Sequence, residues 1–85
     1  MVYRCTDCTD LEELIGSERW EGEHLSFRYG PLTLAMKHGE ELVLENSGVL
    51  SILMLAKVRA LLDSLFIDET SESIRPGTGF HLTLR

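Results

Sequence analysis

The stretch ELVLENSGVLSILMLAKVRALLDS, from Glu41 to Ser64, decides the fold of this chain. It begins with a short apolar run, Leu42–Leu44, which lies between turn-forming residues and is typical of a buried parallel strand. The run Val49–Leu62 follows, contains no Gly or Pro, and is long enough for about four helical turns. A strand, an acidic tip, a tight turn and a helix together predict a βα unit, whose functional site lies at the carboxyl end of the strand.

Length and charge limit the classes of protein to which the chain can belong. Its 85 residues predict a single domain, and a domain of this size buries only about two-thirds of its unfolded surface. The formal net charge is −6, and none of the 8 Lys and Arg residues is adjacent to another. A surface that binds nucleic acid needs clustered Lys and Arg side chains. We therefore expect no nucleic-acid partner.

The hydropathy pattern predicts no membrane segment. The longest apolar stretch, Val49–Leu62, is interrupted by Lys57 and Arg59, and it is shorter than the ~20 residues that a membrane-spanning helix needs. The first residues, Met1–Cys5, lack the apolar core of a secretory signal. We therefore expect a cytoplasmic protein without a membrane partner.

The two cysteines, Cys5 and Cys8, form one C-x-x-C motif. A structural zinc site needs four ligands, and the chain has no second pair of this kind. The motif also contains no aromatic residue or proline, and it does not open a helix that follows a strand. We expect a cysteine at a strand end and a cysteine in a loop. A metal or redox module built on this pair is the third of our functional hypotheses.

The rest of the chain alternates short strands with short helices. We expect strands at Val2–Cys5, Leu25–Tyr29, Leu65–Asp68, Ser73–Arg75 and Phe80–Leu84, and helices at Leu11–Ile15 and Pro31–His38. Asp10 or Thr9 can cap the first helix, and Gly39 ends the second. We expect a polar loop at Ser17–Glu23 and a polar turn at Glu69–Glu72.

Six short motifs occur in an order and at a spacing that resemble the central part of an AAA+ ATPase, most closely of the MoxR or dynein-related type. The motifs are Leu14-Ile15-Gly16-Ser17-x-x-Trp20, Gly30-Pro31-Leu32-x-x-Ala35, Leu42-Val43-Leu44-Glu45-Asn46, Leu61-Leu62-Asp63, Phe66-Ile67-x-Glu69-Thr70 and Ile74-Arg75-Pro76-x-x-x-Phe80. Each motif is weak alone, but together they cover nearly the whole chain.

The resemblance implies an α/β fold: a small three-layer-like fragment with a short parallel sheet, two or three helices and an added β-hairpin. The implied strand order is Phe80–Leu84, Leu42–Glu45, Val2–Cys5, with helices in right-handed crossovers between successive strands. The strand Leu25–Tyr29 and the hairpin Leu65–Arg75 would lie outside this sheet. Residues 1–85 would form a single AAA+-like core fragment.

The chain departs from the family at the residues that carry the ATPase chemistry. It contains no phosphate loop of the form G-x-x-x-x-G-K-[ST]. The Asp-Glu pair that ends the Walker B strand in the family is replaced by Glu45-Asn46, and Asn46 cannot act as a base. The sensor-1 asparagine would fall just beyond Leu84. Glu45 and Asn46 are thus the candidate cofactor-binding residues, as a degenerate Walker B pair.

These departures lead us to expect no catalytic residue, no metal site, no cofactor and no ATPase activity, because phosphoryl transfer needs the missing parts together. Mg-ATP would bind only if another chain supplied the phosphate loop, which is the alternative hypothesis. The run Val49–Leu62 is apolar on more than one face, and an 85-residue domain can cover one face of such a helix but hardly both. We therefore expect a homodimer or a protein partner.

Overall fold

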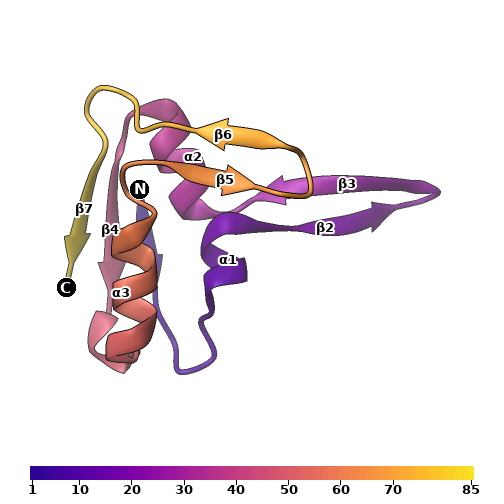
Figure 1. The fold of residues 1–85 in the computed structure, drawn as a ribbon. Helices are drawn as coiled ribbons and strands as arrows, with labels where there is room; N and C mark the ends of the chain where they lie inside the picture. The colour runs from indigo at the N-terminus through magenta and orange to yellow at the C-terminus, as the bar shows by residue number, and fades with distance from the viewer.

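The computed structural model describes residues 1–85 and contains a parallel sheet, three α-helices and two antiparallel hairpins (Figure 1). In chain order the elements are β1 (Val2–Arg4), α1 (Leu11–Ile15), β2 (Gly16–Glu21), β3 (His24–Tyr29), α2 (Pro31–His38), β4 (Glu41–Glu45), the 3-10 turn η1 (Ser47–Val49), α3 (Ile52–Ala60), β5 (Leu65–Ile67), β6 (Glu72–Ile74) and β7 (His81–Leu84). The mixed α/β class predicted from the sequence is confirmed.

The parallel sheet has the order β1-β4-β7, which is the predicted order. The central strand β4 pairs with β1 through Val43 and Val2, and with β7 through Val43 and Thr83. Each of these three strands differs from its predicted range by one residue at one end. The strand β3 and the β5–β6 hairpin lie outside this sheet, as predicted. The pairing of β3 with β2 was not predicted.

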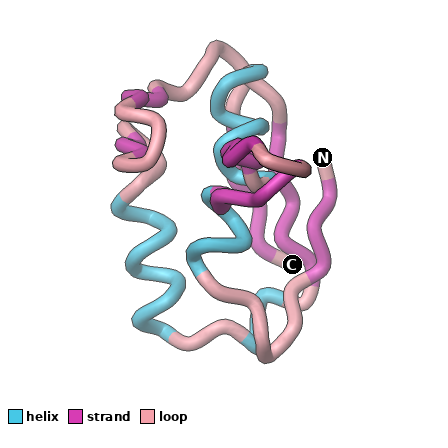
Figure 2. The backbone as a smooth tube through the Cα atoms, turned by 90° about the vertical axis from the view of Figure 1, so that its right-hand side faces the viewer, coloured by secondary structure: helices cyan, strands magenta, loops and turns pink.

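All the helices lie on one side of the parallel sheet (Figure 2). The two crossovers, from β1 to β4 and from β4 to β7, step in the same direction across the sheet, and right-handed crossovers then place both connections on the same face. Leu42 and Leu44 point toward this face and are fully buried. Their neighbour Glu41 points the opposite way and is exposed. The second face of the sheet is therefore not covered by a helix.

The core fills the space between the covered face of the sheet and the helices. Its fully or almost fully buried side chains are Cys5, Leu14, Leu32, Ala35, Met36, Leu42, Leu44, Val58, Leu65, Ile67 and Ile74. These residues come from every helix and from both β5 and β6. The small β5–β6 hairpin thus closes one end of the core.

The β2–β3 hairpin extends away from the rest of the molecule (Figure 1). Its strands pair over their whole length, from Gly16 with Tyr29 to Glu21 with His24. The prediction of a polar loop at Ser17–Glu23 was therefore wrong. Most of β2 is exposed to solvent, so it lacks the alternation of apolar and polar residues that marks a half-buried strand. Its conformation comes from cross-strand pairing with β3.

Two glycines of the family motifs form the junction between α1, the hairpin and α2. A Cβ atom on Gly30 would lie 2.4 Å from the carbonyl oxygens of Glu13 and Leu14, so only glycine fits there. Gly16 ends α1 with a φ of 129°, a value that favours glycine. The Gly30 N–H and the Thr33 hydroxyl both donate to the Ile15 carbonyl, at 2.9 and 2.6 Å.

Helix α3 is shorter than the predicted Val49–Leu62. Ser51 caps its amino end and accepts a hydrogen bond from the Met54 N–H at 3.0 Å, and the preceding residues form the turn η1. The helix therefore starts later than predicted, because the turn η1 takes the place of its first turn. Ser51 favours a helix start at this position, since a serine hydroxyl that accepts a backbone N–H stabilises the first turn of a helix rather than its interior. No helix of this structure is long and apolar enough to cross a membrane.

A polar cluster fastens the β5–β6 hairpin to the rest of the chain. The Tyr29 hydroxyl donates to Glu72, and the Lys37 ammonium lies 3.4 Å from the same carboxylate and 4.4 Å from the centre of the Tyr29 ring. The expected position of Glu72 in a solvated turn was wrong, because it lies in β6 and joins β3 and α2. The hydrogen bond from Tyr29, with Lys37 adding to it, lowers the pKa of Glu72 below its ordinary 4.5.

We predict that Glu72→Gln lowers the free energy of unfolding at pH 7. A carboxylate whose pKa is lower in the folded state stabilises the fold above its ordinary pKa, and this contribution is lost as pH falls through the folded-state pKa. The difference between Glu72→Gln and the parent chain should therefore shrink below pH 4.5. Urea unfolding at both pH values measures this. Glu69→Gln is the control, because Glu69 is exposed, and equal effects of the two changes would contradict the prediction.

Candidate functional site

The carboxyl ends of β1, β4 and β7 meet at one edge of the sheet, where the sequence predicted the site. Glu45 ends β4 and lies in register with Arg4. The Arg85 N–H, just past β7, donates to the Leu44 carbonyl at 2.9 Å. The structure thus brings the degenerate Walker B pair, Glu45 and Asn46, to the predicted edge.

Asn46 has a structural role at this edge. Its backbone is left-handed, with φ 59° and ψ 35°, a conformation that Asn adopts more readily than most residues. Its side-chain Nδ2 donates to the Cys5 carbonyl at 3.3 Å, which joins the end of β4 to the end of β1. The side chain is therefore committed to a hydrogen bond with the main chain.

The next residue, Ser47, joins β4 to β7. Its backbone N–H and its hydroxyl both donate to the Arg85 carbonyl, at 2.8 and 2.9 Å. Together, Asn46 and Ser47 connect all three strand ends. Hydrogen bonds within the chain therefore occupy the turn in which the family places its catalytic acid.

Glu45 is the acidic side chain that the sequence singled out at this edge. It is half-buried, and no hydrogen bond or ion pair joins its carboxylate to another side chain. A Mg²⁺ site usually combines one or two carboxylates with phosphate oxygens and waters. Glu45 could supply one such ligand, but it belongs to no group of three or more His, Cys, Asp or Glu side chains that could hold a metal ion.

The two cysteines occupy different environments. Cys5 is fully buried in the core and Cys8 is exposed, and both are free thiols. Burial raises the pKa of the Cys5 thiol, which keeps it protonated and unreactive at neutral pH. No group of three or more His, Cys, Asp or Glu side chains is arranged to hold a metal ion. The arrangement matches the strand-end and loop cysteines that the sequence predicted.

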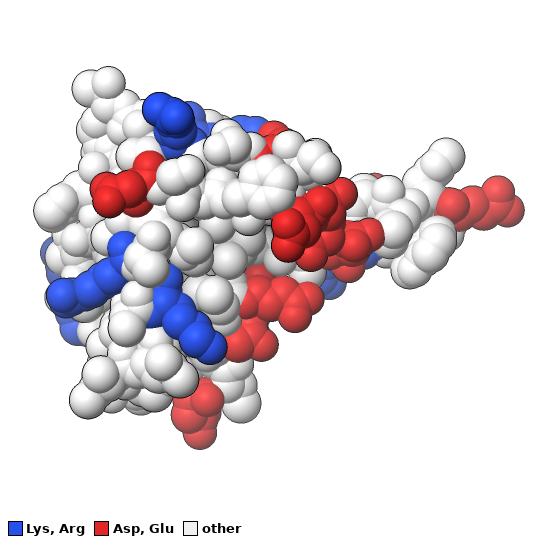
Figure 3. Space-filling model, in the orientation of Figure 1, with Lys and Arg blue, Asp and Glu red and all other residues white.

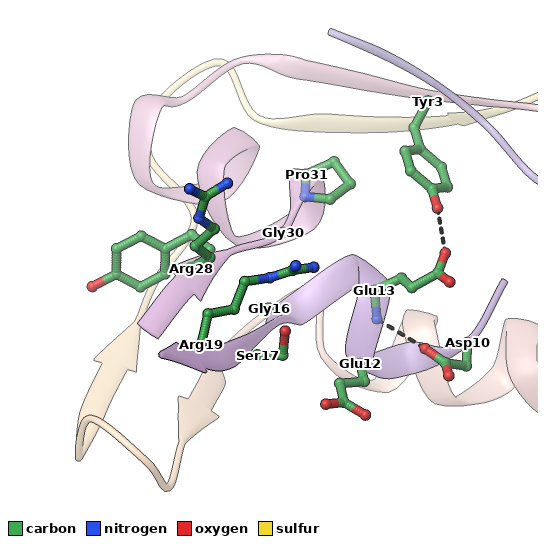
Figure 4. A pocket seen from close by; sticks show the side chains of 11 residues that line it. Tyr3, Asp10, Glu12, Glu13, Gly16, Ser17, Arg19, Arg28, Gly30 and Pro31 are labelled. Carbon is green, nitrogen blue, oxygen red and sulfur yellow. Dashed lines mark hydrogen bonds between the residues drawn. The ribbon is translucent and has the colours of Figure 1, made fainter. Parts of the chain in front are cut away.

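A hollow of about 530 Å³ lies away from the strand ends, between α1 and the base of the β2–β3 hairpin (Figure 4). Arg19 and Arg28 line it from the hairpin, and Tyr3 and Glu13 line it from β1 and α1. The Tyr3 hydroxyl donates to Glu13 at 2.6 Å, and this bond, with burial, raises the pKa of Tyr3. Acidic and basic side chains are mixed around the hollow, so it has no charge preference of its own.

Helix α3 carries an apolar stripe on its solvent side. Its members are Ile52, Leu53 and Ala56, which are neighbours on one face of α3, together with the exposed Val49 of the preceding turn η1. The side chains of Ile52 and Leu53 are 87% and 66% exposed, whereas Val58 on the opposite side is 1% exposed. Lys57 and Arg59 border the α3 stripe, and basic side chains gather over this part of the surface (Figure 3).

Strand β7 leaves one of its edges unpaired. It pairs with β4 on one side and has no strand on the other. Because backbone groups alternate along a strand and the Arg85 N–H faces β4, the groups of Leu82 and Leu84 face away from it. The strand order that the sequence implied already put this strand at an edge of the sheet, and the sequence also predicted an uncovered part of α3. It did not predict the exposed pair Trp20 and Leu25 on the hairpin, because β2 resembled a loop.

No family model matches the chain. A curated protein, Midasin from Giardia intestinalis, is 35% identical over 79 residues, which cover 87% of this chain. The chain spans only 2% of the length of that protein. Midasin is a dynein-related AAA+ ATPase, so the similarity supports a relationship of this chain to a segment of AAA+ ATPases. It agrees with the order of the six motifs.

We predict that Asn46→Ala lowers the free energy of unfolding by about 2 kcal/mol, from left-handed backbone strain and the lost hydrogen bond to Cys5. Asn46→Gly loses the same hydrogen bond but adopts the conformation without strain, so it should cost only about 1 kcal/mol. Urea unfolding of both variants measures the difference. If Asn46→Ala is as stable as Asn46→Gly, the backbone of Asn46 is not under this constraint.

Proposed function

We propose that this chain is a non-catalytic AAA+-like module, of the MoxR or dynein-related type, that acts through protein association. The exposed α3 stripe is the observation that carries this proposal. Burying apolar surface contributes about 25 cal/mol per Å², and a contiguous exposed patch on a small protein commonly marks an interaction site. The stripe includes Ile52, which is 87% exposed.

The free edge of β7 supports association as well. An unpaired strand edge presents N–H and C=O groups that recruit another strand, unless charge, proline or a covering element protects it. No Pro, Lys, Arg, Asp or Glu lies within His81–Leu84. We propose a homodimer as the assembly.

The structure of the Walker B turn supports the non-catalytic part of the proposal. Asn46 occupies the position at which the family has the acid that polarises the attacking water. An amide does not accept a proton at neutral pH, and the Asn46 amide donates to the Cys5 carbonyl. Asn46 and Ser47 bind the main chain at the ends of the neighbouring strands.

We predict that the chain associates at micromolar concentrations and that Leu53→Glu prevents this association. A buried, unpaired carboxylate in an apolar contact costs far more than the contact yields. Phe66→Glu is the matched control, because Phe66 is also an exposed apolar side chain, at 58%, but lies in β5 outside the α3 stripe. Sedimentation equilibrium measures the mass. A parent chain that stays at 9.6 kDa throughout would overturn the proposal.

Glu45 favours a second candidate function, nucleotide binding in a complex where another chain supplies the phosphate loop. Its carboxylate is partly accessible and has no partner in the chain, as a remaining magnesium ligand requires. This candidate and the first differ in what the isolated chain does with nucleotide.

We predict that the isolated chain shows no heat of binding in calorimetric titration with Mg-ATP, and no ATP hydrolysis above blank. We also predict that Glu45→Gln folds as the parent does, because this side chain makes no contact that supports the fold. Circular dichroism checks the fold. Hydrolysis by the parent chain that vanished in Glu45→Gln would contradict the non-catalytic proposal.

A further inference from the structure

The β2–β3 hairpin ends in an exposed apolar pair. Trp20 and Leu25 are 71% and 51% exposed and lie directly opposite each other in the strand register. Partners in register have side chains on the same face of the hairpin, so the two side chains form one surface. We call this pair the hairpin tip. No other tryptophan occurs in the chain.

Acidic side chains lie beside the hairpin tip. Glu18 lies on the same face as Trp20, two positions toward the base, and Glu23 is in the turn. On the other face Arg19 and Glu21 adjoin Trp20, and Glu21 forms an ion pair with Arg28 at 3.9 Å. The acidic charge beside the tip therefore comes from Glu18 and Glu23, and an acidic side chain stands at the far end of the hairpin (Figure 3). An aromatic side chain with acidic neighbours fits an apolar surface with a basic border.

The α3 stripe is a surface of this kind. Ile52 and Leu53 are its most exposed members, and Lys57 and Arg59 lie beside them on α3. Asp7 and Asp10 of the preceding loop line a hollow with Leu53 and Lys57, so the basic side chains of the border are those that α3 itself carries. The hairpin projects to one side of the molecule and α3 lies on the opposite side (Figure 1). The pairing of β2 with β3 holds the hairpin in its direction, so the tip does not reach the stripe of its own chain.

We propose that the hairpin tip of one copy of this chain docks on the α3 stripe of a second copy. The inference rests on the proposed association, and it names the surface that the α3 stripe receives. Both surfaces are apolar, and the acidic border of the tip matches the basic border of the stripe. Complementary charges of this kind favour the encounter and set the orientation of the two copies.

The contact is small, so we expect weak and reversible association. Interfaces below about 1,200 Å² in total are typical of transient complexes. Two copies that exchange their tips reciprocally form a closed dimer, and this arrangement uses both contacts. It is compatible with the proposed homodimer, and it predicts a complex of two chains in sedimentation.

The single tryptophan makes the docking directly observable. Leu53→Glu retains the tip but loses the stripe, whereas Trp20→Ser retains the stripe and does not fluoresce as tryptophan. Adding the Trp20→Ser chain to the Leu53→Glu chain should shift the Trp20 emission to shorter wavelength and protect it from iodide quenching. Neither variant should associate alone, but the mixture should contain a complex of two chains. Ile52→Ser replaces Leu53→Glu if circular dichroism shows that the latter is unfolded.

The control titration uses a double variant, Trp20→Ser with Ile52→Ser, which carries neither surface and should leave the emission unchanged. Charge exchange tests the borders. Glu18→Lys and Lys57→Glu should each weaken the contact about two- to fivefold at low salt, and a mixture in which Glu18→Lys supplies the tip and Lys57→Glu the stripe should recover it.

The outcomes separate this inference from the proposed function. If Trp20→Ser associates as the parent does while Leu53→Glu remains monomeric, the stripe has another partner and the tip docking is wrong. If the two-variant mixture leaves Trp20 emission and mass unchanged although the parent associates, the inference is also wrong. A parent chain that is monomeric at every concentration overturns both.

Discussion

The direction of the two crossovers is the constraint on which the rest of the structure depends. The sheet order β1-β4-β7 requires both connections to move the same way across the sheet. Right-handed connections then put every helix on one face. The buried strand β4 has Leu42 and Leu44 on the covered face, and its Glu41 and Glu45 belong to the face without helices. The fold is one-sided as a consequence of its chirality.

A one-sided arrangement leaves α3 with more apolar surface than the core can use. Val58 packs into the core, while Ile52 and Leu53 on the other side of the helix meet solvent. A helix that is apolar all round is normally buried on all sides. The association that we propose would bury this surface, and Lys57 and Arg59 beside it would suit an acidic partner surface.

The turn after β4 shows how a catalytic position can serve the fold. Asn46 takes a left-handed conformation and bonds to the end of β1, and Ser47 bonds to the end of β7. An Asp or Glu at position 46 would lack the N–H groups that Asn46 directs at the Cys5 carbonyl. Asn46 therefore makes a link between neighbouring strands that an acidic side chain at this position could not make.

The sequence by itself determined the features that depend on local chemistry. The apolar run Leu42–Leu44 predicted the central strand, Pro31 and Gly39 marked the ends of α2, and Asp10 marked the start of α1. These signals are readable because a strand core, a capping side chain and a left-handed glycine each act within a few residues.

Only the tertiary structure decided the features that depend on distant partners. β2 is a strand because β3 pairs with it, although its own pattern resembles a loop. Glu72 belongs to the folded framework because Tyr29, 43 residues away, donates to it. The exposed side of α3 follows from the placement of α1 and the sheet, since the apolar residues of α3 are spread around the helix and do not mark one buried face. Each of these features depends on packing between residues that are far apart in the chain. No short segment of the sequence therefore predicts it.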